Sequence, residues 1–531
     1  MKFGIVDYWV FGIYLVLVIG FGIWIANKEK HQNSQEYFLA GKKLPWWAVG
    51  GSLIASNISA EQMIGMAGSG FLVGLAISSY EWMAAVTLLV VAKFLIPVYL
   101  KENIQTMPQF LERRFDKSVR TGLAVFWVGL FVFVNIASLF FLGSLALKSI
   151  LGISVTAAII GLVLYSATFS IFGGLKAVVW TDVIQVIVLV VGGTFATVMV
   201  LDAVSEGSGL WPGLTALVEK APEKFDMIFT TDVNYTDIET GEVKSAYALL
   251  PGLGVLIGGM WIANLYYWGF NQYIIQRALA AKDVREAQKG IVFAAFIKIF
   301  MPFIVVVPGI AAFVLGADLA KADEAYPWVI NNYVSGGFKG LVVAAIVAAI
   351  GSSISSMVNS TSTIYTLDIH RHYFAKNASE DQLVLIGKIS AGATLIIGAL
   401  MAPALNSFDQ IFQYIQKYTG FISPGVLAIF LFGLYWKKTT TKGALAAVFL
   451  AIPLSIFLDF VLPDMAFLHK MGISFIILSA IIIVVSLIDG KSKYAAHAID
   501  LPKGIFKTST PFNIMALMVM MLIAAIYAIF W

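Results

Sequence analysis

The chain is dominated by apolar segments that are long enough to cross a lipid bilayer. A transmembrane helix needs about 20 consecutive apolar residues, and the sequence of 531 residues divides into about 14 such segments. Hydrophobic residues make up 59% of the chain and charged residues 12%, against about 45–50% and about 25% in soluble domains. We therefore predict an all-α polytopic membrane protein, with residues 1–531 forming a single transmembrane domain.

Several function classes are excluded by what the sequence lacks. Its net charge of +4 is too small and too dispersed to indicate nucleic-acid binding. Cysteine is absent, which rules out disulfides, thiolate metal sites and thiol catalysis. The sequence also contains no glycine-rich nucleotide-binding motif and no nucleophile-elbow serine. We therefore predict no cofactor and no enzymatic activity.

Basic residues indicate how the chain is oriented in the membrane. Most of the 35 Lys and Arg fall in alternate loops, which the positive-inside rule assigns to the cytoplasm. This assignment predicts a multi-pass protein of the inner (plasma) membrane with both termini extracytoplasmic. The acidic insert 204–248 then lies outside, either as a solvated loop or as a shield over an entrance.

Two apolar segments are interrupted by polar residues, which predicts broken helices. The first, 46–75, carries Asn57 and Gln62 near its middle, and the second, 254–273, carries Asn264 and Tyr267. Paired interrupted segments in corresponding positions of two halves are the best sequence pointer to the binding site of a transporter. We therefore expect a solute site at these two segments.

Ionisable and hydroxylic residues inside apolar segments leave two interpretations open. Glu81 and Lys298 either form a buried structural ion pair or present charged hydrogen-bonding groups to a polyhydroxylated ligand. Asp182 begins a further segment. Adjacent Ser352 and Ser353 lie in a run of small residues that either packs helices closely or, beside the free carbonyls of a broken helix, binds sodium.

Aromatic and amide side chains are equally open to two interpretations. Tyr267 belongs to a cluster of rings that is either an aromatic belt at the bilayer boundary or a stacking surface for a sugar. Gln416 lies near the start of a later segment, where exposed amides are common without any function.

Four longer motifs resemble the sodium:solute symporter family, including its sodium/galactose and sodium/glucose branch. They are residues 36–47 (EYFLAGKKLPWW), 57–62 (NISAEQ), 263–277 and 412–425. The resemblance covers nearly the whole chain and implies the leucine-transporter fold, with a core of five helices and five inverted counterparts. It implies a first repeat at 46–203 and a second at 249–436, with an extra helix at 6–27 and three more in 443–531.

The same resemblance implies roles for individual residues. One sodium ion would be bound by the carbonyls of Ala55, Ile58 and Ala349 and the hydroxyls of Ser352 and Ser353, with Asp182 on its exit path. A sugar would be hydrogen-bonded by Gln62, Glu81, Asn264, Lys298 and Gln416. Tyr267, held by Asn57, would stack under the sugar as an inner gate, and Met66, Tyr80 and Phe412 would close the outer side.

One departure from the family pattern concerns the sugar. Ala84 stands where the resemblance leads us to expect a serine, and one missing hydrogen bond can decide between epimers. The resemblance therefore implies sodium-coupled symport of a hexose, galactose or glucose, with sodium, sugar and the lipid bilayer as partners. The alternatives are a symporter of the same fold for proline, pantothenate or sialic acid, and a membrane sugar sensor that does not concentrate its ligand.

Overall fold

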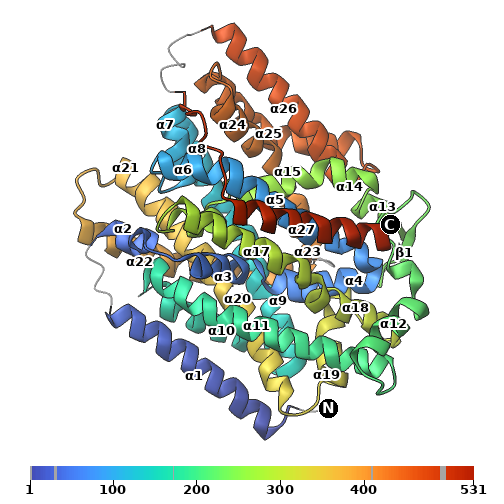
Figure 1. Cartoon of the computed structure of the whole chain (residues 1–531). Coiled ribbons are helices and arrows are strands. Elements are labelled where there is room, and N and C mark those ends of the chain that lie inside the picture. The colour runs from blue at the N-terminus through green and yellow to red at the C-terminus, as the bar shows by residue number, and fades with distance from the viewer. Residues whose placement is uncertain (1–2, 29–32, 172, 239, 408–410, 491–497) are drawn as a thin grey trace.

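Residues 3–28, 33–171, 173–238, 240–407, 411–490 and 498–531 are described by the computed structural model. This part of the chain is almost entirely helical (Figure 1), as the composition predicts. The sheet within it is a single antiparallel hairpin of β1 (Asn234–Thr236) and β2 (Val243–Ser245).

The helices of the first half follow the predicted segments. They are α1 (Ile5–Lys28), α2 (Ser34–Leu39), η1 (Ala40–Lys42), α3 (Trp46–Asn57), η2 (Glu61–Met66), α4 (Ala67–Val73), η3 (Gly74–Ser78), α5 (Ser79–Val90), η4 (Val91–Leu95), α6 (Ile96–Lys101), α7 (Met107–Arg114), α8 (Lys117–Gly129), η5 (Leu130–Ile136), α9 (Ala137–Leu151), α10 (Val155–Ser170), α11 (Gly174–Val204), α12 (Leu210–Lys220) and η6 (Pro222–Lys224).

The second half continues after the hairpin, and three long helices end the chain. The second half comprises α13 (Ala246–Leu249), α14 (Leu253–Ile257), α15 (Gly259–Leu265), η7 (Tyr266–Phe270), α16 (Gln272–Leu279), α17 (Val284–Val305), α18 (Val307–Val314), η8 (Ala322–Glu324), α19 (Ala325–Tyr333), α20 (Phe338–Thr363), η9 (Ile364–His370), α21 (Arg371–Tyr373), α22 (Glu380–Met401), η10 (Ala402–Ser407), α23 (Ile411–Gly420) and α24 (Ser423–Tyr435). The last three are α25 (Thr441–Val461), α26 (Phe467–Asp489) and α27 (Thr510–Ile529).

The number of spans differs from the prediction. Among the described residues, 10 helical stretches are long and apolar enough to cross a membrane, or 12 if each of two bent pairs is one span. The predicted total of about 14 is higher because the helix lengths differ from the predicted segment lengths in two places. Residues 61–101 count as one candidate span although they include parts of two predicted segments, and α10 is shorter than 18 residues. The predicted segment that starts near 409 begins outside the described residues, and its described part contains the bent pair Tyr414–Gly420 and Ser423–Tyr435.

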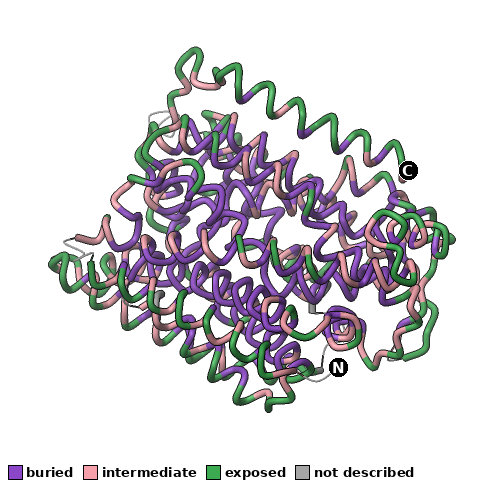
Figure 2. Tube along the Cα trace, turned by 60° about the horizontal axis from the view of Figure 1, so that its bottom comes forward, coloured by how far each residue is buried: buried purple, intermediate pink, exposed green. Residues whose placement is uncertain are grey.

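Burial divides the helices into a core and a periphery. In α20, 94% of the most apolar window is buried, against 22% in α1 and α27 and 28% in α25 and α26. The α1 helix and the α25–α26 pair lie at opposite edges of the bundle (Figure 1), and large apolar side chains on them are exposed, among them Trp9, Phe457 and Ile488. Figure 2 shows the buried centre of the bundle and exposed helices at its periphery. A helix with an apolar exposed face suits contact with lipid, whereas α20 is in contact with protein on all sides.

The first predicted helix break is confirmed, and it lies between α3 and η2. Ile58 leaves the helical conformation (φ −75°, ψ 102°). The Ser59 amide would continue the helix by donating to the Ala55 carbonyl, but it donates to Gln62 Oε1 instead (3.0 Å). Side-chain oxygens that bond nearby backbone groups compete in this way with helical hydrogen bonds. The polar sequence Asn57–Gln62 is therefore the local cause of the break.

The second break is displaced from its predicted position. Asn264 and Tyr267 lie in continuous helical backbone, α15 followed by the π-helical turn η7. The backbone departs from helical geometry at Gly258 (φ −118°, ψ −131°) and at Asn271 (φ −79°, ψ 123°), on either side of them. The predicted interruption of segment 254–273 is therefore confirmed, but the breaks lie on either side of Asn264 and Tyr267, whose side chains project from helical backbone.

The insert between α11 and α13 is folded against the bundle rather than extended into solvent. Its residue Lys224 donates to the carbonyls of Phe71 (3.1 Å) and Leu72 (2.6 Å) at the end of α4 and lies 4.0 Å from the Phe313 ring centroid. Gly74 permits this approach, since a Cβ at that position would lie 2.1 Å from the Lys224 carbonyl oxygen. The insert thus caps the carbonyl end of the broken helix.

Burial lowers the pKa of Lys224 from 10.5 to about 8, with Glu223 opposing the change. Because the unfolded chain then binds more protons between pH 8 and 10.5, the free energy of unfolding rises with pH over that interval. We expect Lys224→Met to remove this rise. Thermal unfolding midpoints of both proteins in detergent, measured across the interval, test it.

Lys220→Met is the matched control, because it removes a lysine from the same insert. A difference between wild type and Lys224→Met that stays constant with pH would contradict the burial of the Lys224 ammonium group.

Candidate functional site

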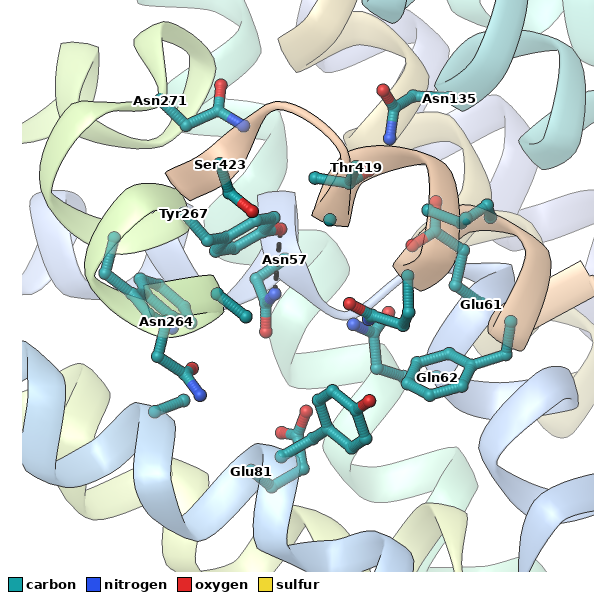
Figure 3. A pocket seen from close by; sticks show the side chains of 18 of the residues that line it. Asn57, Glu61, Gln62, Glu81, Asn135, Asn264, Tyr267, Asn271, Thr419 and Ser423 are labelled. Carbon is teal, nitrogen blue, oxygen red and sulfur yellow. Dashed lines mark hydrogen bonds between the residues drawn. The ribbon is translucent and has the colours of Figure 1, made fainter. Parts of the chain in front are cut away.

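A cavity of about 60 Å³ lies between the two broken helices. Figure 3 shows polar side chains from α3, η2, α5, α15, η7 and α23 directed into one space. The predicted site residues that line it are Asn57, Gln62, Tyr80, Glu81, Asn264, Tyr267, Lys298, Phe412 and Gln416, together with Ala84. Met66 is buried in η2 but does not line the cavity.

Glu81 and Lys298 form an ion pair at the wall of this cavity. The Lys298 ammonium donates to Glu81 Oε2, and both side chains are almost completely buried. The ammonium also lies 5.3 Å from the Trp268 ring centroid. Because both residues line the cavity, the two interpretations of the sequence are compatible: the groups pair with each other and still face a solute.

Two amides of the cavity have one polar end fixed by protein. Gln62 Oε1 accepts from the Ser59 amide and hydroxyl (3.0 and 2.8 Å), so that the Gln62 amino group is left for a ligand. The Asn264 amino group donates to the Met260 carbonyl (3.1 Å), which leaves its oxygen as an acceptor. The cavity thus offers both donors and acceptors in fixed positions.

Aromatic rings close the cavity on two sides. Tyr267 accepts a hydrogen bond from the Asn57 amino group (2.9 Å), which is the dashed contact in Figure 3, and its hydroxyl also meets that of Tyr273. On the other side the Tyr80 and Phe412 rings pack edge to face, with centroids 5.3 Å apart. Solute in this arrangement would be separated from both ends of the bundle.

The structure adds cavity residues that the sequence did not single out. Each has a buried oxygen without a hydrogen-bond partner among the described residues: Glu61, Asn135, Asn271, Thr419 and Ser423. Buried polar groups are rarely left unpaired, so these oxygens are candidate partners for the hydroxyl groups of a ligand or for water. Asn135 had a usable signal, since it is a lone amide within an apolar segment.

Of the predicted sodium ligands, Ser353 on α20 contacts the end of α3 just before its break, and Ser352 lies next to it. The Ser353 hydroxyl donates to the Ser56 carbonyl (3.0 Å), and the Ser352 hydroxyl donates to Asp182 Oδ1 (2.5 Å). A hydroxyl that donates its proton keeps its lone pairs, so both serines can still bind a cation. Ala55, Ile58 and Ala349 are fully or almost fully buried in the same core. Neutral oxygens of this kind suit a hard monovalent cation.

Asp182 has a buried counter-charge that the sequence did not reveal. Its Oδ2 accepts from the Ser52 hydroxyl (2.5 Å) and lies 3.9 Å from the Arg277 guanidinium group. Arg277 in turn donates to Ser356, whose hydroxyl contacts that of Ser56 at 2.7 Å. Arg277 is the last residue of the motif 263–277, but the sequence alone does not show which carboxylate it contacts.

In this helical membrane protein, a broken helix and a helix with small hydroxylic residues flank an enclosed polar cavity. This architecture is that of the secondary transporters. Residues 37–451 match the Sodium:solute symporter family, and the chain is a member of that family. Family membership identifies it as a transporter rather than an enzyme.

Individual relatives are similar to this chain in sequence over most of its length. The chain is 47% identical to a sodium/glucose cotransporter of Vibrio parahaemolyticus over 99% of this chain and 98% of the relative. It is 31% identical to the sodium/myo-inositol cotransporter 2 of Sus scrofa over 85% and 70%.

Solved structures share the fold at low sequence identity. A Na+-coupled sialic acid symporter in a substrate-bound outward-open state has a TM-score of 0.78 at 23% identity, covering 92% of this chain and 98% of that one. Mhp1, a nucleobase-cation-symport-1 family transporter, has a TM-score of 0.53 at 13% identity, with 87% and 98% covered. The predicted leucine-transporter type of fold is confirmed.

The buried ion pair makes a testable prediction about stability. Glu81→Gln leaves the Lys298 charge buried without a partner, and we expect a loss of about 3–5 kcal/mol in the free energy of unfolding. Adding Lys298→Met should restore most of that loss, because no unpaired charge then remains. Thermal unfolding of the purified variants in detergent measures both effects.

Lys101→Gln is the control, since Lys101 forms only exposed ion pairs with Glu102 and Asp500. Its expected cost is below about 1 kcal/mol. Equal stability of the Glu81→Gln single variant and the double variant would contradict the coupling.

Proposed function

We propose that this protein is a symporter that couples the inward movement of sodium to uptake of a neutral hexose of the glucose type. The observation that carries the proposal is the enclosed polar cavity next to the break of α3, with Ser352 and Ser353 of α20 beside that break. The sodium/glucose cotransporter at 47% identity over almost the whole chain supports the choice of both solutes.

The chemistry of the cavity favours a polyhydroxylated neutral solute. Gln62 and Lys298 supply donors, whereas Glu81 and Asn264 supply acceptors, and a sugar hydroxyl can act as either. Gln416 adds a further amide to the lining of the cavity. Tyr267 supplies an aromatic face for the apolar side of the ring, and its contact with Asn57 holds it as an inner gate.

An anionic solute such as sialic acid fits the cavity less well. The charged residues that line the cavity are Glu61, Glu81 and Lys298, and Lys298, the one cation among them, is already paired with Glu81. A carboxylate on the solute would find no unpaired cation in the cavity, which disfavours its binding. The neutral hexose is therefore preferred over the sialic acid alternative.

Sodium in this proposal binds between α3 and α20. Its ligands are the carbonyls of Ala55, Ile58 and Ala349 and the hydroxyls of Ser352 and Ser353. The Ala55 carbonyl receives no hydrogen bond from the Ser59 amide, which supports its availability. Asp182 lies next to Ser352 and would attract the ion as it leaves toward the cytoplasm.

Coupling follows from what the two ligands hold together. Sodium would join the end of α3 to α20, and Asn57 at that same end holds the gate residue Tyr267. Each ligand then stabilises an arrangement that the other one also prefers, so each raises the affinity of the other. Loss of sodium to the cytoplasm would weaken the gate and release the sugar.

The assignment of repeats and orientation belongs to the same proposal. The first repeat is 46–203 and the second 249–436, because a helix break opens each of them, at Ile58 and at Asn271. Met66, Tyr80 and Phe412 close the outer side in this proposal, and the Tyr80 and Phe412 rings are in contact. Both termini are extracytoplasmic in the inner membrane, as the distribution of basic loops indicates.

Counterflow in proteoliposomes tests the choice among the hypotheses. We expect vesicles loaded with unlabelled glucose to accumulate labelled glucose, and an inward sodium gradient to drive net accumulation without preloading. Sialic acid and proline should not compete. A sugar sensor would bind glucose without counterflow, and uptake that ignores the sodium gradient would contradict symport.

Replacement of one proposed sodium ligand gives a sharper prediction. Ser353→Ala should raise the sodium concentration for half-maximal uptake by about tenfold, roughly the effect of one lost ligand oxygen, while expression stays intact. Ser355→Ala is the control, because the Ser355 hydroxyl donates to Gly351 within its own helix. Normal uptake by Ser353→Ala at limiting sodium would refute the ion-site assignment.

A further inference from the structure

A second cavity lies at the other end of the described bundle from α12 and β1, between the α7–α8 corner and the continuation of α20 into η9 and α21 (Figure 1). It has a volume of about 370 Å³ and shares no lining residue with the site above. The distribution of basic loops predicts that this end faces the cytoplasm. No role in the proposed symport cycle accounts for it.

The charged side chains of this cavity are unequal in number. Its cations are Lys117, Arg120, Arg371 and Lys376, and its carboxylates are Glu112 and Asp368. The lining therefore has an excess of two positive charges, with His372 counted as neutral. A concave surface with excess charge of one sign concentrates ligands of the opposite sign.

Arg120 pairs with both carboxylates at the base of the cavity, and these three residues together keep one net negative charge. Arg120 forms ion pairs with Glu112 and with Asp368 (3.2 Å) and donates to the carbonyls of Leu367 (3.0 Å) and Asp368 (2.9 Å). By contrast, Lys117, Arg371 and Lys376 have no ion pair with any described residue. These three cations at the rim are therefore available to an anion.

Asp368 adds a requirement that a simple anion does not meet. Its Oδ1 accepts from the Thr106 hydroxyl (3.1 Å), but its Oδ2 is buried and has no hydrogen-bond donor among the described residues. Leaving such an acceptor unpaired costs about 1–3 kcal/mol. A ligand that carries a hydroxyl group as well as an anionic group would satisfy both Asp368 and the rim.

We propose that this cavity binds a phosphate ester bearing free hydroxyl groups, with its phosphate at the three rim cations and a hydroxyl donating to Asp368. Phosphate oxygens form strong charge-assisted bonds with Lys and Arg. Two sources share this chemistry, a free sugar phosphate and the headgroup of phosphatidylglycerol. The proposal does not depend on which solute the protein transports.

An occupant of this cavity also touches the elements that carry the transport site. The first amide of α7, at Met107, donates to Gln272 Oε1 (2.8 Å), and Gln272 begins α16 just after the second helix break. The neighbouring Thr106 contacts Asp368 on the extension of α20. A ligand bound at Asp368 and Lys117 therefore stabilises one relative position of α16 and α20.

Binding to the purified full-length protein in neutral detergent tests the proposal, with glucose 6-phosphate as the free probe and glucose and inorganic phosphate as comparisons. We expect calorimetry to show saturable binding of glucose 6-phosphate and clearly weaker binding of inorganic phosphate. Inorganic phosphate should have no effect on glucose binding at the transport site. Lys117→Gln/Lys376→Gln should weaken glucose 6-phosphate binding by about tenfold or more. Lys437→Gln/Lys438→Gln, an equal charge change outside the cavity, should not weaken it.

A second experiment tests the lipid headgroup as the ligand. It compares the protein in nanodiscs of phosphatidylglycerol with the protein in nanodiscs of phosphatidylcholine. If phosphatidylglycerol raises the unfolding temperature of the wild type but not of Lys117→Gln/Lys376→Gln, the lipid headgroup is the ligand and the proposal stands. If neither probe distinguishes the wild type from this variant, the proposal is overturned. Equal affinity for glucose 6-phosphate and inorganic phosphate would overturn the role given to Asp368.

Discussion

The break of α3 at Ile58 is the feature on which the arrangement of the core depends. A helix that stops at membrane depth exposes carbonyl and amide groups that lipid cannot satisfy, at a cost of several kcal/mol each. Here the Ser59 amide finds Gln62, and the Ser56 carbonyl accepts from Ser353 of α20. Because these partners must surround the break on all sides, α20 is the most completely buried of the long helices.

Prediction from sequence succeeded where side-chain composition determines backbone structure. Apolar length is sufficient to identify most of the helices, and the polar run Asn57–Gln62 is sufficient to identify the first break, because its own side chains compete for backbone hydrogen bonds. The second break was misplaced for the complementary reason. Asn264 uses its amino group on Met260 within a helix and disturbs nothing, whereas the break comes at Asn271.

Contacts between distant segments account for what the sequence could not reveal. Glu81 and Lys298 are 217 positions apart in the chain, yet they form an ion pair. The sequence was compatible both with a structural ion pair and with a ligand site. Arg277 lay in a quoted motif, yet its position beside Asp182 depends on how α16 crosses α11 and α20. Met66, which the sequence places in the outer lid with Tyr80 and Phe412, is fully buried and is not among the residues that line the cavity.

The short helix α16 offers a physical route between the two proposed ligands. Tyr273 and Arg277 lie one helical turn apart on it, so they share a face and move together. The Tyr273 hydroxyl contacts the gate residue Tyr267, while Arg277 donates to Ser356 and Ser52 beside Asp182. A displacement of the gate that tilts α16 would therefore disturb the hydroxyl network around Ser352. The gate and the ion site are thus joined by one rigid element, and neither can rearrange without a cost to the other.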